Sequence, residues 1–224
     1  MRSFPRSLEH ELLDAPHPDP AELSRNLREM AMLNRLPGGV GSSVGAVLEL
    51  LPGDPGPVLD VGTGSGDFAR HLRRRSGVPV ALVDVSAAVL DVTRRNVAGM
   101  DDVTVQIGDA RALPLADESA TVAHASLLLH HLEPDDAVSA LREMRRVARR
   151  GVVVNDLRRS RLAFALTAIP VLTLARGQYT RHDGLLSARR AYTVAELDDL
   201  AADAGLRPVA RTASWWPRVT TTYR

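Results

Sequence analysis

The stretch VLDVGTGSGDF, residues 58–68, decides the fold of this chain. It opens with an apolar run typical of a buried strand, turns through Gly62, Gly64 and Gly66, and enters an amphipathic run at Phe68. The pattern predicts a strand, a glycine turn and a helix. A turn of this kind brings the backbone close to a ligand and directs N–H groups at it from the helix start. We therefore expect a nucleotide-like ligand at the turn.

The spacing of the glycines indicates which class of nucleotide-like ligand the turn binds. The dinucleotide-binding fingerprint GxGxxG would need a glycine at position 67, where this chain has Asp67. The glycines stand instead in the order DxGxGxG, with an aspartate two residues before the first of them. In this form the turn resembles the first motif of class I S-adenosylmethionine (SAM) dependent methyltransferases. The resemblance implies SAM as cofactor, released as S-adenosylhomocysteine, with contacts from Asp60, Gly62, Thr63, Gly64 and Gly66.

Acidic residues follow two later strands that the pattern predicts. Asp84 ends an apolar strand at residues 80–83, and its place about 20 residues beyond the glycine turn suits hydrogen bonds from two ribose hydroxyls. Asp109 follows an alternating strand at residues 103–107, and the resemblance implies that its carboxylate accepts from the adenine amine. The other predicted cofactor contacts lie beside these acids or at the end of the fourth strand: Val85, Ala110 and Ser126.

Five predicted strands alternate with helices, at residues 58–61, 80–83, 103–107, 121–129 and 152–154. This alternation predicts a parallel sheet with right-handed crossovers, whose ligands lie at the carboxyl ends of the strands. Two further strands, at residues 206–211 and 218–223, match the antiparallel pair that closes the sheet in the family it resembles. The expected fold class is therefore α/β: a three-layer Rossmann-like methyltransferase fold with N-terminal helices, whose seven-stranded sheet is mostly parallel with an antiparallel last strand.

The 224 residues correspond to one α/β domain. Residues 1–52 are expected to be an N-terminal helical extension of that domain, with one helix capped by Asp19 and another near residues 43–51. Residues 53–224 then form the SAM-dependent methyltransferase domain. Within it, Thr193 and Glu196 predict a capping box for a late helix.

An apolar stretch between Arg161 and Arg176 is interrupted by Pro170, which predicts a kinked helix. A polar loop is expected after it, at residues 177–192. Because folds of this kind commonly insert substrate-recognition segments after the fifth strand, we interpret the segment of about 158–192 as a lid over a substrate pocket. Buried packing without contact to a substrate is the alternative interpretation.

The composition excludes several classes of function. The chain has 28 basic residues, all arginine, and 27 acidic ones, so its net charge of +1 gives no overall attraction to nucleic acid. It has no cysteine, hence no disulfide, thiolate metal site or cysteine nucleophile. No apolar stretch reaches the roughly 20 residues of a membrane helix, and the start lacks a secretory signal. We expect a cytoplasmic protein without membrane insertion that acts on a small-molecule acceptor, and we leave a homodimer open.

The expected reaction needs little chemical help. A sulfonium is already activated, so alignment and a dry pocket supply most of the rate, and a base is needed when a hydroxyl acceptor must lose its proton. Three histidines are candidate bases: His130 and His131 follow the fourth strand, beside the expected methyl donor, and His182 lies in the predicted loop. His124, amid apolar neighbours within the strand, is expected to be a core histidine.

We expect no metal ion. Catechol-type methyltransferases hold a divalent ion with a carboxylate at the end of the fourth strand and an Asp–Asn pair at the fifth. Here the fourth strand ends in SLLL, residues 126–129, which offers no carboxylate. Asn155 and Asp156 at the end of the fifth strand keep a metal-assisted route open.

The sequence from LLLHHL, through REMRRVARRGVVVNDLRRSRLA, to HDGLLSARRAYTVAEL resembles small bacterial methyltransferases encoded beside polyketide synthases. The resemblance implies O-methylation of a phenolic or polyketide hydroxyl, and the apolar lid fits such an acceptor. Two other functions stay open. One is methylation of RNA or protein through arginine clusters, and the other is SAM binding without methyl transfer, for example to steer a cyclisation.

Overall fold

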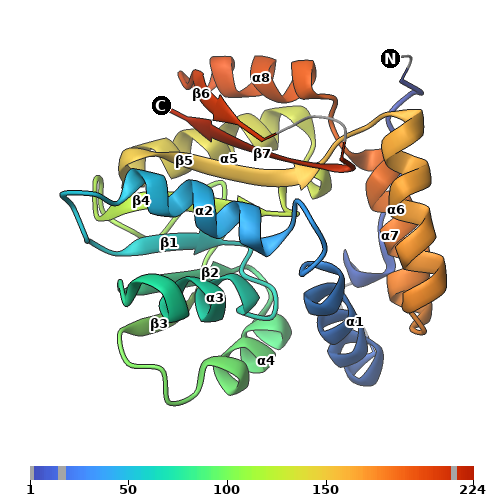
Figure 1. Cartoon of the computed structure of the whole chain (residues 1–224), viewed down its shortest axis with the longest axis horizontal. Helices are drawn as coiled ribbons and strands as arrows, with labels where there is room; N and C mark the ends of the chain where they lie inside the picture. The colour runs from blue at the N-terminus through green and yellow to red at the C-terminus, as the bar shows by residue number, and fades with distance from the viewer. Residues whose placement is uncertain (1–2, 15–18, 213–215) are drawn as a thin grey trace.

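The structure is a computed structural model, which describes residues 3–14, 19–212 and 216–224. Its centre is a seven-stranded sheet in the order β3-β2-β1-β4-β5-β7-β6 (Figure 1). Strands β1 to β5 run parallel, and β7 is antiparallel to both of its neighbours. The predicted sheet is therefore confirmed. Its strands are β1 (Val58–Val61), β2 (Val80–Asp84), β3 (Val103–Ile107), β4 (Ala120–Ser126), β5 (Ala148–Leu157), β6 (Pro208–Arg211) and β7 (Arg218–Tyr223).

Helices cover both faces of the sheet. On one face pack α2 (Val40–Leu50), α3 (Asp67–Ser76) and α4 (Ala87–Val97), and on the other α5 (Pro134–Val147) and α8 (Val194–Asp203). Strand β1 is buried along its whole length because both of its faces are covered. This burial leaves the carboxyl ends of the strands as the place where polar groups can meet a ligand.

A third group of helices stands at the carboxyl ends of the strands. It comprises α1 (Pro20–Leu33), α6 (Arg161–Leu174) and α7 (Gln178–Arg190), with α6 and α7 packed side by side (Figure 1). Two short 3-10 helices, η1 (Leu12–Asp14) and η2 (Leu129–His131), both contact α7. Within the described residues, no helix has the length and apolar character needed to cross a membrane.

The polar loop predicted at residues 177–192 is wrong, because most of that segment forms α7. The buried side of the helix is largely polar and includes Thr180, Asp183 and Ser187, so the apolar periodicity that identifies a helix from sequence is missing. The start of α7 is fixed by another element: the Glu29 carboxylate of α1 accepts hydrogen bonds from the Gly177 N–H at 3.1 and 3.2 Å. Tertiary contacts therefore determine this helix.

Strand β4 ends at Ser126 and does not continue to residue 129 as predicted. Leu127 takes a left-handed backbone conformation, with φ of 55°, and the chain turns into η2. This turn carries His130 and His131 out of the sheet and toward α7.

The local signals at helix starts are confirmed. Asp19 caps α1 by accepting a hydrogen bond from the Glu22 N–H at 2.8 Å, and Thr193 and Glu196 form the predicted capping box of α8. Helix α6 runs through Pro170 as a single element.

Candidate active site

The glycine turn between β1 and α3 has the geometry of a ligand cradle. Gly62, Gly64 and Gly66 adopt positive φ angles of 68°, 53° and 73°, which residues with side chains rarely tolerate. A Cβ atom on Gly62 would come within 2.9 Å of the Leu128 side chain. Gly66 also begins α3, whose first N–H groups lack intrahelical partners. The turn thus combines close backbone approach with available donors, and these residues fit a nucleotide-like cofactor.

Asp60 lies beneath the turn and is almost fully buried. Its carboxylate accepts a hydrogen bond from Thr63 Oγ1 at 2.8 Å and lies 2.7 Å from His124 Nδ1. The His124 ring is buried as well and stacks on Phe68 with a centroid distance of 3.8 Å. His124 is thus a core residue, as its sequence context predicts, and it holds Asp60 in place from below.

Asp84 stands at the end of β2, next to the turn. One of its carboxylate oxygens accepts from the Gly64 N–H at 3.3 Å and the other from the Ser86 N–H at 3.0 Å. Burial raises the pKa of the Asp84 carboxyl and nearby Asp60 adds to the rise, while the two N–H groups oppose it. The structure therefore brings Asp84 to the glycine turn, and its contact with a ribose stays a prediction.

The predicted adenine site is an open surface at the end of β3. Asp109 is partly exposed and accepts from both the backbone and the guanidinium of Arg111, which lowers the pKa of the carboxyl. Ala110 packs on the core below. Beside it, Val85 is 68% exposed and Ile107 59%, an apolar pair that a flat base would cover. Ile107, which no sequence signal marked, is the last residue of β3.

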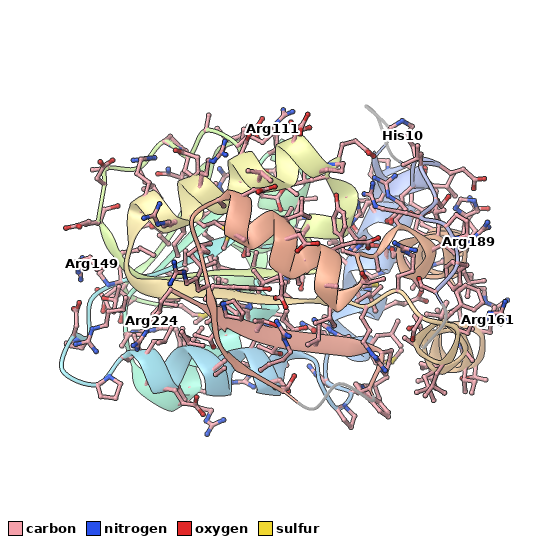
Figure 2. The ribbon with its side chains drawn as sticks, turned by 90° about the horizontal axis from the view of Figure 1, so that it is seen from above. His10, Arg111, Arg149, Arg161, Arg189 and Arg224 are labelled. Atoms are coloured by element: carbon pink, nitrogen blue, oxygen red, sulfur yellow. The ribbon has the colours of Figure 1, made fainter. Side chains whose placement is uncertain are left out.

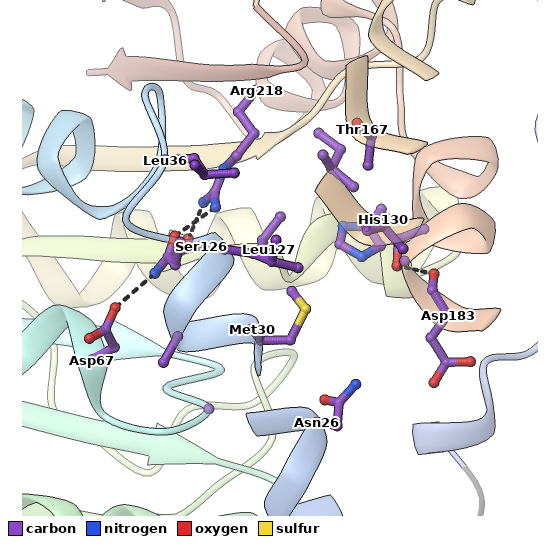
Figure 3. A pocket seen from close by; sticks show the side chains of 18 of the residues that line it. Asn26, Met30, Leu36, Asp67, Ser126, Leu127, His130, Thr167, Asp183 and Arg218 are labelled. Carbon is purple, nitrogen blue, oxygen red and sulfur yellow. Dashed lines mark hydrogen bonds between the residues drawn. The ribbon is translucent and has the colours of Figure 1, made fainter. Parts of the chain in front are cut away.

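A cavity of about 230 Å³ runs from the glycine turn toward α6 and α7. Its walls come from the turn, α1, η2, α6 and α7, so residues distant in the sequence meet there (Figure 3). The predicted site residues on its wall are Asp60, Gly62, Thr63, Gly64, Ser126, His130 and His131. The predicted residues outside the lining are Gly66, Asp84, Val85, Asp109, Ala110 and His182.

His130 is the best placed of the three candidate bases. Its side chain is buried at the cavity wall, and its Nδ1 atom lies 2.6 Å from Asp156 Oδ1. Burial acts to raise the pKa of the Asp156 carboxyl, but the charge attraction and hydrogen bond of His130 outweigh it and hold the pKa below its usual value. An ionised Asp156 keeps the His130 proton on Nδ1 and leaves Nε2 as the basic atom.

His131 and Glu11 complete a polar cluster around His130. The two imidazole centroids lie 4.3 Å apart, and the Glu11 carboxylate lies 3.9 Å from His130 Nε2 and 3.8 Å from His131 Nε2. Ser187 Oγ donates to Glu11 at 2.7 Å. Two imidazoles and a carboxylate, with ligand atoms all within 4.8 Å, form a donor set that a divalent transition metal accepts. No sequence pattern marked Glu11, and the expectation of no metal stays a prediction.

His182 does not reach this cluster. Its side chain is 51% exposed, and its Nδ1 atom lies 2.8 Å from Asp183 Oδ1. Asp183 faces inward, where it accepts hydrogen bonds from the backbone N–H groups of Leu12 and Leu13. The structure thus places His182 away from the cavity wall that carries His130.

Arginine side chains tie two distant segments to the backbone of η2. Arg190 of α7, only 2% exposed, donates to the backbone oxygens of His130 at 3.2 Å and of His131 at 2.8 Å. Arg6, in the N-terminal strap (residues 3–14), donates to the backbone oxygens of His130 and Leu132 at 3.2 and 2.8 Å. The strap and α7 therefore fix the position of η2, which carries the candidate base.

The Methyltransferase domain family matches residues 58–151, which hold β1 to β4 and the predicted cofactor contacts. Residues 58–151 are therefore a methyltransferase domain, and its glycine turn and strand order are those of the class I, SAM-dependent type. SAM is accordingly its cofactor, as the glycine turn predicts. A SAM dependent methyltransferase from Aquifex aeolicus has the same fold, with a TM-score of 0.65 and 20% identity over 92% of this chain and 97% of that one.

Two curated relatives differ in the atom that receives the methyl group. Malonyl-[acyl-carrier protein] O-methyltransferase of Methylococcus capsulatus is 32% identical over 146 residues, which are 65% of this chain and 50% of that protein. The ubiquinone/menaquinone biosynthesis C-methyltransferase UbiE of Xanthomonas campestris pv. campestris is 39% identical over 114 residues, 47% of this chain and 42% of that protein. The chain thus spans about half the length of these relatives or less.

Replacing Asp84 with Asn should weaken binding of SAM by on the order of 1 to 3 kcal/mol, because charge-assisted hydrogen bonds to the ribose are lost. In the wild type, affinity should also fall as the pH is lowered toward the pKa of Asp84, because protonation removes the acceptor, and this loss should begin at a higher pH than for an ordinary aspartate since that pKa is raised. Isothermal titration calorimetry measures both effects. Asp91→Asn, a change at an exposed acid of α4, serves as the control. An unchanged dissociation constant in Asp84→Asn would remove Asp84 from the site.

Proposed function

We propose that the protein transfers a methyl group from SAM to a hydroxyl group of a small apolar acceptor, with His130 as the base. The observation that carries the proposal is a cavity that has the glycine turn at one end and His130 on its wall, where Asp156 contacts the imidazole from behind the lining. A cofactor on the turn and an acceptor beside His130 would share one space, walled by α1, α6 and α7.

SAM, when bound, supplies the electrophilic methyl group. The glycine turn and Asp84 would hold the cofactor, and His130 Nε2 would take the proton of the acceptor hydroxyl as that oxygen becomes the nucleophile. The Asp156 carboxylate, 2.6 Å from Nδ1, then stabilises the imidazolium that forms. The surrounding helices keep water from the reacting oxygen, which preserves its reactivity.

The cavity walls support an apolar acceptor with one polar edge. Leu27 and Met30 of α1 and Leu166 and Val171 of α6 line the cavity, together with the polar cluster at His130. A phenolic or polyketide-derived ring suits such walls, with its hydroxyl turned to the basic atom. The names of the two relatives describe methyl transfer to oxygen in one case and to carbon in the other. The preference for O-methylation therefore rests on the placement of His130.

We also propose the predicted division of the chain. Residues 1–52 extend the domain with α1 and α2, residues 53–224 carry the methyltransferase core, and the segment of about 158–192 is the lid. In support, α6 and α7 occupy most of that lid segment and contribute walls of the cavity. Closure over an acceptor would give the dry pocket that methyl transfer needs.

The alternatives have less support. For an RNA substrate a basic patch would be expected, and Arg111, Arg149 and Arg161 lie on separate sides of the molecule and so do not form one together (Figure 2). A role that binds SAM without methyl transfer would make no use of a buried histidine held by a carboxylate at the cavity wall.

The function is tested by incubating the protein with methyl-labelled SAM and an extract of the host cells. Enzyme-dependent label should enter the organic phase, because the cavity accepts small apolar molecules. Label in the RNA or protein pellet alone would overturn the acceptor class. Bound SAM without label in any fraction, in the presence of the identified acceptor, would favour a non-methylating role.

Changing His130 to Gln should lower kcat by about 100- to 10,000-fold, the usual contribution of a general base, and should leave SAM affinity unchanged. Asp156→Asn should also lower kcat, because the amide no longer fixes the imidazole tautomer. His182→Gln is the matched control and should retain activity, since its side chain lies outside the cavity lining. Steady-state rates and SAM titrations distinguish these outcomes. A wild-type kcat in His130→Gln would exclude it as the base.

Glu11, His130 and His131 permit a second route to the same product, in which a divalent cation lowers the pKa of the acceptor hydroxyl. If His130 acts as the base, dialysis against a chelator should leave kcat unchanged, and elemental analysis should find no stoichiometric metal. A loss of activity that one divalent ion restores, and that Glu11→Gln abolishes, would instead assign these residues to a metal site.

A further inference from the structure

A buried cation stands on the cavity wall near the glycine turn, and the proposed mechanism does not use it. Arg218, the first residue of β7, is 8% exposed and lines the cavity. Its guanidinium donates to three neutral oxygen atoms: Asn155 Oδ1 at 2.9 Å, Asn34 Oδ1 at 2.6 Å and Ser126 Oγ at 2.8 Å. Figure 3 shows Arg218 directed at Ser126. In the part of the chain that the structure describes, no carboxylate forms an ion pair with it.

The charge of Arg218 is therefore only partly balanced. Burial lowers the pKa of the guanidinium to about 10, although the carboxylates of Asp156 and Asp67 oppose this from a distance. The group is still cationic at neutral pH. A buried charge without an opposite charge in contact is unfavourable, and an anion that enters beside it gains a strong, directional partner.

A negative group lies close to Arg218 on the same wall. Asn34 accepts from Arg218 through its Oδ1 atom and donates from Nδ2 to Asp67 Oδ2 at 3.3 Å. Asn34, Asp67 and Arg218 all line the cavity, as do Gly62 and Thr63 of the turn. Asp67 also pairs with Arg70 through its other oxygen, Oδ1, at 3.2 Å. One asparagine thus holds a cation and a carboxylate with one oxygen on the cavity side a short distance apart, an arrangement that suits an α-amino acid zwitterion.

The order of the strands fixes which end of the cofactor meets this pair. Asp84 ends β2 and Asp109 follows β3, so the predicted ribose and adenine contacts lie on one side of β1. Ser126 ends β4 and Arg218 begins β7, on the other side. A cofactor whose adenosine covers β2 and β3 therefore directs its amino acid end toward Arg218.

We propose that Arg218 binds the carboxylate of the methionyl end of SAM, and that Asp67, linked to it through Asn34, binds the ammonium group of the same end. Arg218 is in this assignment a specificity residue, which distinguishes complete SAM from adenosyl thioethers that lack the carboxylate. The inference rests on SAM as the cofactor and is independent of the acceptor. Its test consequently needs binding alone, and the proposed function can fail while it holds.

The test compares the binding of S-adenosylhomocysteine with that of its decarboxylated analogue by calorimetry. Wild-type protein should bind the complete ligand about ten- to a hundredfold more tightly, the scale of one charge-assisted contact. Arg218→Gln should lose most of this difference by weakening the complete ligand alone, and Arg218→Lys should retain part of it. Asp67→Asn should in the same way reduce the preference over the analogue that lacks the amino group.

Arg211→Gln is the matched control, because Arg211 lies on neighbouring β6 and binds Asp198 and Thr221 outside the cavity. It should leave both affinities unchanged. Equal affinity of the wild type for the two ligands would overturn the proposal without any variant, so the test does not depend on whether Arg218→Gln folds. An equal loss of affinity for both ligands in a folded Arg218→Gln would also overturn it, because that result would mean that Arg218 only maintains the structure of the cavity wall.

Discussion

Because helices cover both faces of the mostly parallel sheet, polar groups can meet a ligand only at the edge where β1 to β5 end. The rest of the molecule depends on this constraint. The strand interiors are apolar, so a charged group is tolerated only where the strands end or where another buried group balances it. Asp60 illustrates the second case, since His124 and Thr63 satisfy its carboxylate below the turn. All the remaining polar residues of the candidate site gather at the carboxyl ends of the strands.

The positions of the glycine turn, Asp84 and Asp109 in the fold were predictable because their signals are local. The glycine turn, Asp84 and Asp109 each follow a strand directly, and a parallel sheet aligns the carboxyl ends of its strands at one edge. Strand count and the antiparallel last strand followed from the same alternation and from the family resemblance.

The rest of the candidate site was predictable only in part, because its contacts join residues far apart in the chain. His130 and His131 were identified by their place after β4, but Glu11, Arg190 and Arg218 reach the site from segments that no local pattern connects to it. The sequence predicts a loop where α7 lies, because the buried side of this helix is polar and its start is held by Glu29 of another helix. The sequence alone does not show which distant residues contact one another in the fold.

Arg190 and Arg6 hold η2 by its backbone oxygens, and this choice of atoms has an evolutionary consequence. Every residue type presents the same carbonyl group, so the path of the chain at residues 130–132 is independent of the side chains carried there. Substitutions at these positions can change the reacting side chains while the backbone that carries them keeps its conformation. Such a scaffold is suited to divergence, because side chains that act on a new acceptor can arise at residues 130–132 without a change in the rest of the fold.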